Sequence, residues 1–232
     1  TKKKEVRLIR GTSTSNTSFG AGTRIDGDLN LSRTRTRKLP KKFRVSGNLD
    51  LSGTPISRLP KDIQIGGDLD LSLSDIEQLP ANLHIPGNLI LVGSLITRLP
   101  KGLRVGGNLD LRATAVEVLP ESLVVGGDLD LSGTTIQEIP KKLSVGGDLY
   151  LVSSLVAKLP SRMILKGGLD LSATLIRRLP EQLVVGSWLN LSGTTVRKLP
   201  KKLVVGSWLE IRGTEIQGLP KTARVAGEFF AA

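Results

Sequence analysis

The sequence predicts a mainly β solenoid made of about ten repeats of 20 residues. Ten of the 12 prolines recur at every twentieth position from Pro40 to Pro220, and no insertion or deletion breaks this spacing. Such a lattice is typical of supersecondary units that stack into an elongated fold. Within each unit, apolar residues recur at six places that are separated by polar or small residues. This alternation predicts short strands joined by turns.

Each unit divides into a bend, a strand and a turn. In the unit that begins at Pro120 the six apolar positions are Leu123, Val125, Leu129, Leu131, Ile136 and Ile139. The strand 128–132 alternates, so its two leucines are expected to face inward and its two aspartates outward. The preceding glycine pair, Gly126 and Gly127, supplies either a positive φ or a close backbone approach. Each proline ends the turn by fixing its own φ.

A hydroxyl side chain follows the strand in all ten units. These residues are Thr34, Thr54, Ser74, Ser94, Thr114, Thr134, Ser154, Thr174, Thr194 and Thr214. We expect each hydroxyl to bond backbone groups of its own coil and of the adjacent coil, because a buried turn would otherwise leave polar groups unpaired.

The segment 129–143, LDLSGTTIQEIPKKL, resembles the leucine-rich-repeat core L-x-L-x-x-N-x-L-x-x-L-P-x-x-L, with Thr134 in the Asn position. A 20-residue period with Leu-Pro in each unit is similar to the short repeats of secreted bacterial effector proteins. The resemblance implies a right-handed coil with one parallel sheet and with turns or irregular backbone opposite. It also implies a non-catalytic scaffold that binds proteins, as part of a secreted effector or another larger protein.

Two departures from the family pattern leave a second architecture open. The ladder Asn is Thr or Ser throughout, and Val125 lies four residues before Leu129 where the family usually has three. A right-handed parallel β-helix of the same period is the alternative.

We expect three parts along the chain. Residues 1–19 form an irregular N-terminal arm and a degenerate cap, 20–220 form the repeat solenoid, and 221–232 form a C-terminal cap that shields the last apolar layer. The chain begins at Thr1 without methionine, which indicates a piece of a longer protein.

Composition excludes several classes of chemistry. The chain has no cysteine and one histidine, His84, so thiolate zinc sites, cysteine nucleophiles and the cysteine-dependent ligase activity of some relatives are excluded. No phosphate loop, nucleophile elbow or metal-ligand spacing occurs. We therefore expect a monomeric non-enzyme without cofactor, metal or small-molecule substrate. No apolar run approaches the length of a membrane span.

Two outward strand positions carry most of the polar groups of the expected sheet. The earlier of the two positions is either Asp or Asn in every unit from Asp28 to Asp148. This exchange predicts a side-chain hydrogen bond to the glycine turn. The middle position, which we call the acidic row, holds Asn30, Asp50, Asp70, Ile90, Asp110, Asp130, Tyr150, Asp170, Asn190 and Glu210. Aligned carboxylates repel by roughly 1 kcal/mol at about 5 Å. The row is therefore either simply solvated or offset by a cation or a basic partner.

Aromatic residues interrupt this polar face in the C-terminal half. Trp188 and Trp208 take the earlier outward position in adjacent coils, and Tyr150 lies on the same face. Because tryptophan and tyrosine dominate binding hot spots, we expect a protein contact here. The candidate residues are Tyr150, Trp188, Trp208, Asp110, Asp130, Asp170, Asn190 and Glu210. The alternative is that the rings only stabilise the last coils.

Basic residues gather at a different place in the unit. Lys and Arg number 33 and give a net charge of +12, and 22 of them flank Leu-Pro. The strongest candidates are Arg177, Arg178, Arg197, Lys198, Lys201 and Lys202. Such a ridge is either a solvated edge or a surface for nucleic acid or anionic membrane. Few aromatic side chains and no groove-entering helix argue against sequence-specific nucleic-acid binding. A structural spacer is the remaining alternative.

Overall fold

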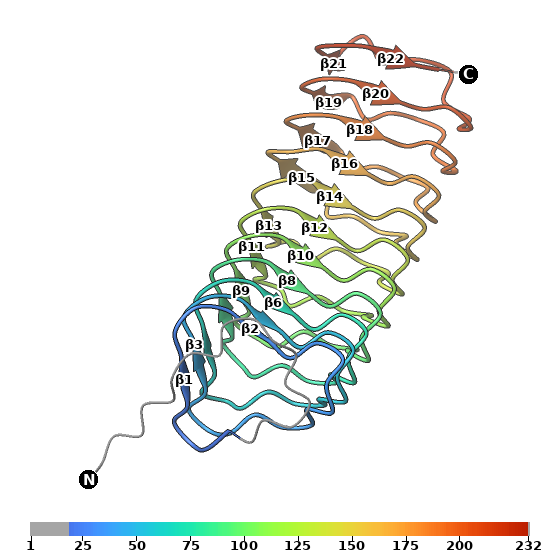
Figure 1. The fold of residues 1–232 in the computed structure, drawn as a ribbon. Coiled ribbons are helices and arrows are strands. Elements are labelled where there is room, and N and C mark those ends of the chain that lie inside the picture. Colours follow the sequence, from blue (N-terminus) through green and yellow to red (C-terminus); the bar gives the residue numbers. More distant parts are fainter. Residues whose placement is uncertain (1–18, 232) are drawn as a thin grey trace.

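The computed structural model describes residues 19–231, which form one column of stacked coils (Figure 1). The described residues contain no helix, and the expected leucine-rich-repeat-like parallel β-solenoid is confirmed. The N-terminal arm expected at 1–19 lies, apart from Phe19, outside the described residues. The described part of the expected C-terminal cap, 221–231, forms a further coil with two short strands, and its capping role stays a prediction.

One face of the column is an 11-stranded parallel sheet. Its strands, in spatial order, are β2 (Leu29–Asn30), β4 (Leu49–Asp50), β6 (Leu69–Asp70), β8 (Leu89–Ile90), β10 (Leu109–Asp110), β12 (Leu129–Asp130), β14 (Leu149–Tyr150), β16 (Leu169–Asp170), β18 (Leu189–Asn190), β20 (Leu209–Glu210) and β22 (Phe229–Phe230). Every residue pairs with the residue 20 positions later, as Leu109 does with Leu129. Each position of the unit therefore forms a straight column of side chains along the sheet.

A second row of parallel strands runs beside the large sheet (Figure 1) and is interrupted twice. Its strands are β1 (Arg24–Ile25), β3 (Arg44–Val45) and β5 (Gln64–Ile65); β7 (His84–Ile85), β9 (Arg104–Val105), β11 (Val124–Val125) and β13 (Ser144–Val145); and β15 (Arg162–Leu165), β17 (Gln182–Val185), β19 (Lys202–Val205) and β21 (Arg224–Val225). These strands were not predicted from the repeat pattern. In the last group β15, β17 and β19 lengthen to four residues each.

The core lies inside the coils and is continuous from Ile25 to Ile211. In the unit that begins at Pro120, all six predicted apolar side chains are buried, with exposed fractions from 0% at Leu129 to 5% at Ile139. Burying such a side chain stabilises the fold by roughly 1.5–3 kcal/mol. The apolar positions read from the repeat are therefore the layer that holds adjacent coils together.

The glycine pair serves close packing between coils. A Cβ added to Gly126 would overlap the carbonyl oxygen of Gly106, and one added to Gly127 would overlap Oδ1 of Asn108. The positive φ considered for this pair is found instead in the turn after the strand, for example at Gly133 with φ 68°. Of the two expected roles, only the close approach applies to the pair.

The hydroxyl column satisfies the turn within each coil. Thr134 Oγ1 donates to the Leu131 carbonyl at 2.6 Å. Eight of the ten positions make this bond. Among the described residues, the hydroxyls of Ser94 and Ser154 have no partner although they are buried. The expected side-chain bond to the adjacent coil is not formed, because the carbonyl three residues earlier already lies within reach.

Candidate protein-binding surface and basic groove

The earlier outward position of the large sheet carries a hydrogen-bonded ladder between coils. Oδ1 of Asp28 accepts from the Asn48 N–H, and Oδ1 of Asn48 accepts from the Asp68 N–H, both at 2.7 Å. The same bond repeats through five more coils and ends at the Gly168 N–H. We call this the polar ladder. The expected side-chain bond is thus made to the glycine bend of the next coil, where the glycine leaves room for the oxygen.

Side-chain oxygens of the acidic row accept hydrogen bonds from the turn that follows each strand. Asp50 Oδ1 accepts from the Ser52 N–H at 2.9 Å, and Asn30 and Asn190 make the same bond. The feature that these positions share is thus a short-range acceptor, which explains why Asn replaces Asp there.

Internal cations offset part of the acidic row. The Arg112 guanidinium lies 2.6 Å from Asp110 and 3.5 Å from Asp130, and its hydrogen bond to Asp110 raises the pKa of Arg112. Arg212 holds Glu210 at 2.6 Å, and this hydrogen bond lowers the pKa of the Glu210 carboxyl. Two of the five polar candidates, Asp110 and Glu210, therefore already have a strong partner within the chain.

The predicted aromatic residues come together in space. Tyr150 and Trp188 lie 5.7 Å apart between ring centroids, and Trp188 stacks on Trp208 at 5.2 Å with 9° between the ring planes. Phe230 meets Trp208 edge-on at 6.3 Å. We call these four residues the aromatic column. Phe230 was missed, although its register with Glu210 places it in the row of Tyr150.

Gly168 makes this contact between non-adjacent coils possible. A Cβ at Gly168 would overlap the Trp188 indole, which lies over this glycine and reaches Tyr150 in the coil beyond it. The Tyr150 hydroxyl donates to Asp148 Oδ2 at 3.1 Å. Burial first, and then the Asp148 charge, raise the pKa of Tyr150 to about 12. Both indoles remain partly exposed, so the column presents apolar surface to solvent.

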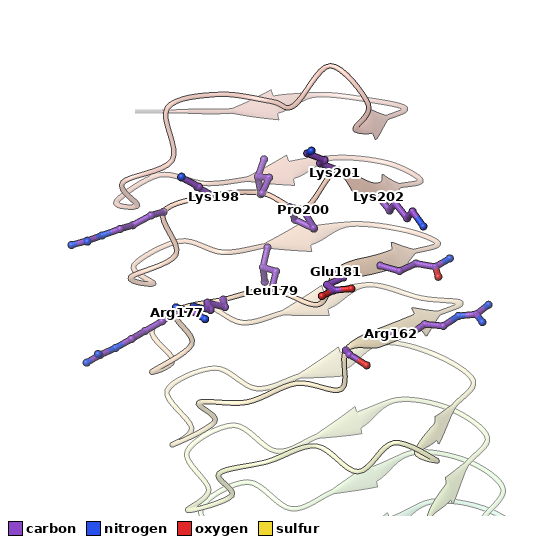
Figure 2. A pocket seen from close by; sticks show the side chains of 13 residues that line it. Arg162, Arg177, Leu179, Glu181, Lys198, Pro200, Lys201 and Lys202 are labelled. Carbon is purple, nitrogen blue, oxygen red and sulfur yellow. The ribbon is translucent and has the colours of Figure 1, made fainter.

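All six predicted ridge residues line one groove of about 790 Å³ between the last coils (Figure 2). Arg162 is a seventh cation in this lining, and Glu181 is its one carboxylate. Figure 2 shows Leu179 and Pro200 between Arg177 and Lys198 on one side and Arg162 and Lys202 on the other. We call this the basic groove. Among the described residues, Arg197 alone of its cations forms an ion pair, with Glu215 at 2.9 Å.

The described residues contain neither a metal-binding cluster nor a membrane-spanning helix. Residues 19–231 hold no cluster of three or more His, Asp or Glu residues that could bind a metal ion. In this same part of the chain, no helix has the length and apolar character needed to cross a bilayer.

Comparison with known proteins finds similarity to two solved bacterial structures. No protein-family model and no curated protein sequence matches the chain. A leucine-rich-repeat protein of Leptospira interrogans is similar, with 18% identity, a TM-score of 0.43, and 89% of this chain and 77% of that one covered. YopM from Yersinia enterocolitica is similar at 17% identity and a TM-score of 0.35, with 88% and 65% covered. With its unbroken 20-residue period and its parallel strands, the chain is a leucine-rich-repeat-like β-solenoid.

Proposed function

We propose that the protein is a non-catalytic scaffold that binds another protein through the aromatic column. The observation that carries the proposal is the place where the polar ladder stops. Its last acceptor is Asp148, and the next three equivalent positions are Gly168, Trp188 and Trp208. Each ladder bond stabilises by about 0.5–1.5 kcal/mol, so the aromatic coils give up bonds where they gain exposed rings. Stacking between the rings recovers part of the lost stabilisation, but rings can also stack without being exposed to solvent.

The surroundings of the column indicate the chemistry of the partner. Asp170 pairs in the sheet with Tyr150 on one side and Asn190 on the other, and Asp148 lies beside the tyrosine hydroxyl. An apolar strip edged by carboxylates fits a segment that combines an apolar or aromatic side chain with Lys or Arg. Asp130 lies further along the same row, beyond Tyr150, whereas Asp110 and Glu210 are held by Arg112 and Arg212.

A monomeric role within a longer, secreted bacterial protein belongs to the same proposal and rests on the repeat pattern described above. The competing role as a structural spacer requires no exposed apolar surface on the sheet, and the aromatic column therefore weighs against it.

The test is selection of displayed random peptides on the immobilised protein, followed by measurement of each Kd. We expect selected peptides that combine basic and apolar residues. We expect their Kd to rise at least about tenfold on the double variant Trp188→Ala with Trp208→Ala, because central tryptophans typically contribute 2 kcal/mol or more.

The matched control is Ile164→Ser with Val204→Ser, which removes apolar surface from the second row of strands instead. This variant should keep wild-type Kd values, and circular dichroism should show both variants folded. Peptides that bind the folded tryptophan variant as tightly as the wild type would contradict the proposal.

A further inference from the structure

The basic groove adjoins an exposed aliphatic surface on the second row of strands. β15, β17 and β19 alternate between outward and inward side chains, and Ile164, Val184 and Val204 face outward in register. Ile164 is 55% exposed and Val204 is 37% exposed. We call these three residues the apolar stripe. The outward residues two positions earlier on the same strands, Arg162, Gln182 and Lys202, line the groove.

Cations and aliphatic side chains therefore share one continuous face of the last coils. Seven Lys and Arg side chains against one Glu leave a strong local excess of positive charge. Six of the seven have no ion-pair partner among the described residues. A surface that combines free cations with neighbouring aliphatics matches a bilayer of anionic lipid, whose phosphates attract the cations and whose acyl boundary accepts the aliphatics.

The neighbouring groove, formed mainly by earlier coils, lacks this combination. It has a similar volume of about 690 Å³, but its charged lining is Glu117, Glu121, Glu138, Lys141 and Lys158. Lys158 is paired with Glu138 at 2.6 Å. The excess of cations is thus a property of particular coils and not of the repeat.

The N-terminal coils have the basic residues but lack the apolar stripe. Lys41 and Lys42 occupy the unit positions of Lys201 and Lys202, yet the outward strand residues beside them are Arg24, Arg44 and Gln64 in place of the apolar stripe. The first coils are therefore basic without being apolar, and they offer a control within the same chain.

From these contrasts we propose that the basic groove and the apolar stripe together dock the protein on an anionic lipid bilayer. Nucleic acid fits the same face less well. The lining of the groove contains no aromatic side chain on which a base could stack. The apolar stripe would also have no role against a phosphate backbone. The inference is independent of the aromatic column, which lies on the large sheet.

The experiment is co-sedimentation with phosphatidylcholine vesicles that either contain or lack phosphatidylserine. We expect binding only to the anionic vesicles, weakening as NaCl is raised, because the attraction is electrostatic. Lys201→Glu with Lys202→Glu should weaken binding at least about 30-fold, since each basic residue near such a surface contributes about fivefold. Ile164→Ser with Val204→Ser should weaken binding several-fold without any change in net charge.

The matched control is Lys41→Glu with Lys42→Glu, which changes the net charge by the same amount at the same unit positions. It should bind anionic vesicles within about threefold of wild type. Equal losses in the two charge variants would overturn the proposal, since attraction would then follow total charge.

Two further results would also overturn it. One is unchanged vesicle binding by the folded serine variant. The other is a single-stranded oligonucleotide that binds through Lys201 and Lys202 while wild-type protein does not sediment with anionic vesicles. The tryptophan double variant should sediment like wild type, so that failure of lipid docking and failure of peptide binding are told apart.

Discussion

The two parts of the large sheet share one backbone arrangement but carry different side chains at the earlier outward position. From β2 to β14 the earlier outward position holds Asp or Asn, and each side chain bonds the backbone of the next coil. From β16 onward that position holds Gly168, Trp188, Trp208 and Glu228, and the aromatic rings pack on one another instead. Strand register is the same in both halves. The coils therefore stack in the same way with either set of side chains, and this position determines the chemistry of the exposed face.

From Gly47 to Gly167, glycine at the second position of the bend accompanies the polar ladder. Where a ladder oxygen arrives from the previous coil, the second residue of the bend is Gly, as at Gly127 beneath Asn108 and Gly167 beneath Asp148. Where Gly168 and Trp188 supply no such oxygen, the same position is Ser187 and Ser207. The requirement for glycine is therefore steric and local.

The largest predicted effect is in the polar half. Gly127→Ala places a Cβ on Oδ1 of Asn108 and against the Gly107 backbone, so the coil must shift or break the ladder bond to Asp128. We expect the free energy of unfolding to fall by about 2–3 kcal/mol. Urea denaturation followed by circular dichroism measures it.

The equivalent change in the aromatic half is the control. Ser187→Ala should alter the unfolding free energy by no more than about 0.5 kcal/mol, because this position already carries a Cβ. Equal costs at Gly127 and Ser187 would contradict the steric explanation, because only at Gly127 does a ladder oxygen occupy the place of the Cβ.

A smaller effect is expected where the aromatic column crosses a glycine. Gly168→Ala places a Cβ in the space of the Trp188 indole. We expect the stack to shift away from Tyr150, with a loss of about 1 kcal/mol, the usual worth of an aromatic pair. Near-ultraviolet circular dichroism and urea denaturation report the two changes. An unaltered aromatic spectrum would show that the indole does not depend on this gap.

Much of the fold follows from periodicity, since proline spacing and six apolar positions define a coil whose side chains repeat. The basic groove could also be predicted, because unit positions that coincide in sequence coincide in a stack. All six predicted ridge residues indeed line it.

Contacts that cross coils were harder to predict. The Asp28 carboxylate accepts from the N–H of Asn48, 20 residues away, and the repeat pattern alone does not specify which coil supplies this donor. Arg112 neutralises Asp110 and Asp130 from the turn, and nothing in its type distinguishes it from a solvated arginine. Phe230 joins the aromatic column only because the last coil keeps the register.

The smallest predicted effect concerns the single tyrosine of the chain. Burial and Asp148 raise the pKa of Tyr150 to about 12, above the value of about 10 for a free phenol. The protonated phenol is therefore favoured by the fold, and its contribution to stability is complete below about pH 10 and lost as the pH rises towards about 12. Trp188→Ala uncovers the phenol and should move its pKa towards 10, as measured by tyrosinate absorbance. Trp208→Ala, whose ring stacks on Trp188 one coil further from Tyr150, should leave the pKa in place. If Trp188→Ala left the titration unchanged, the indole would not be what buries Tyr150, and the tyrosine would be separate from the stack of Trp188, Trp208 and Phe230.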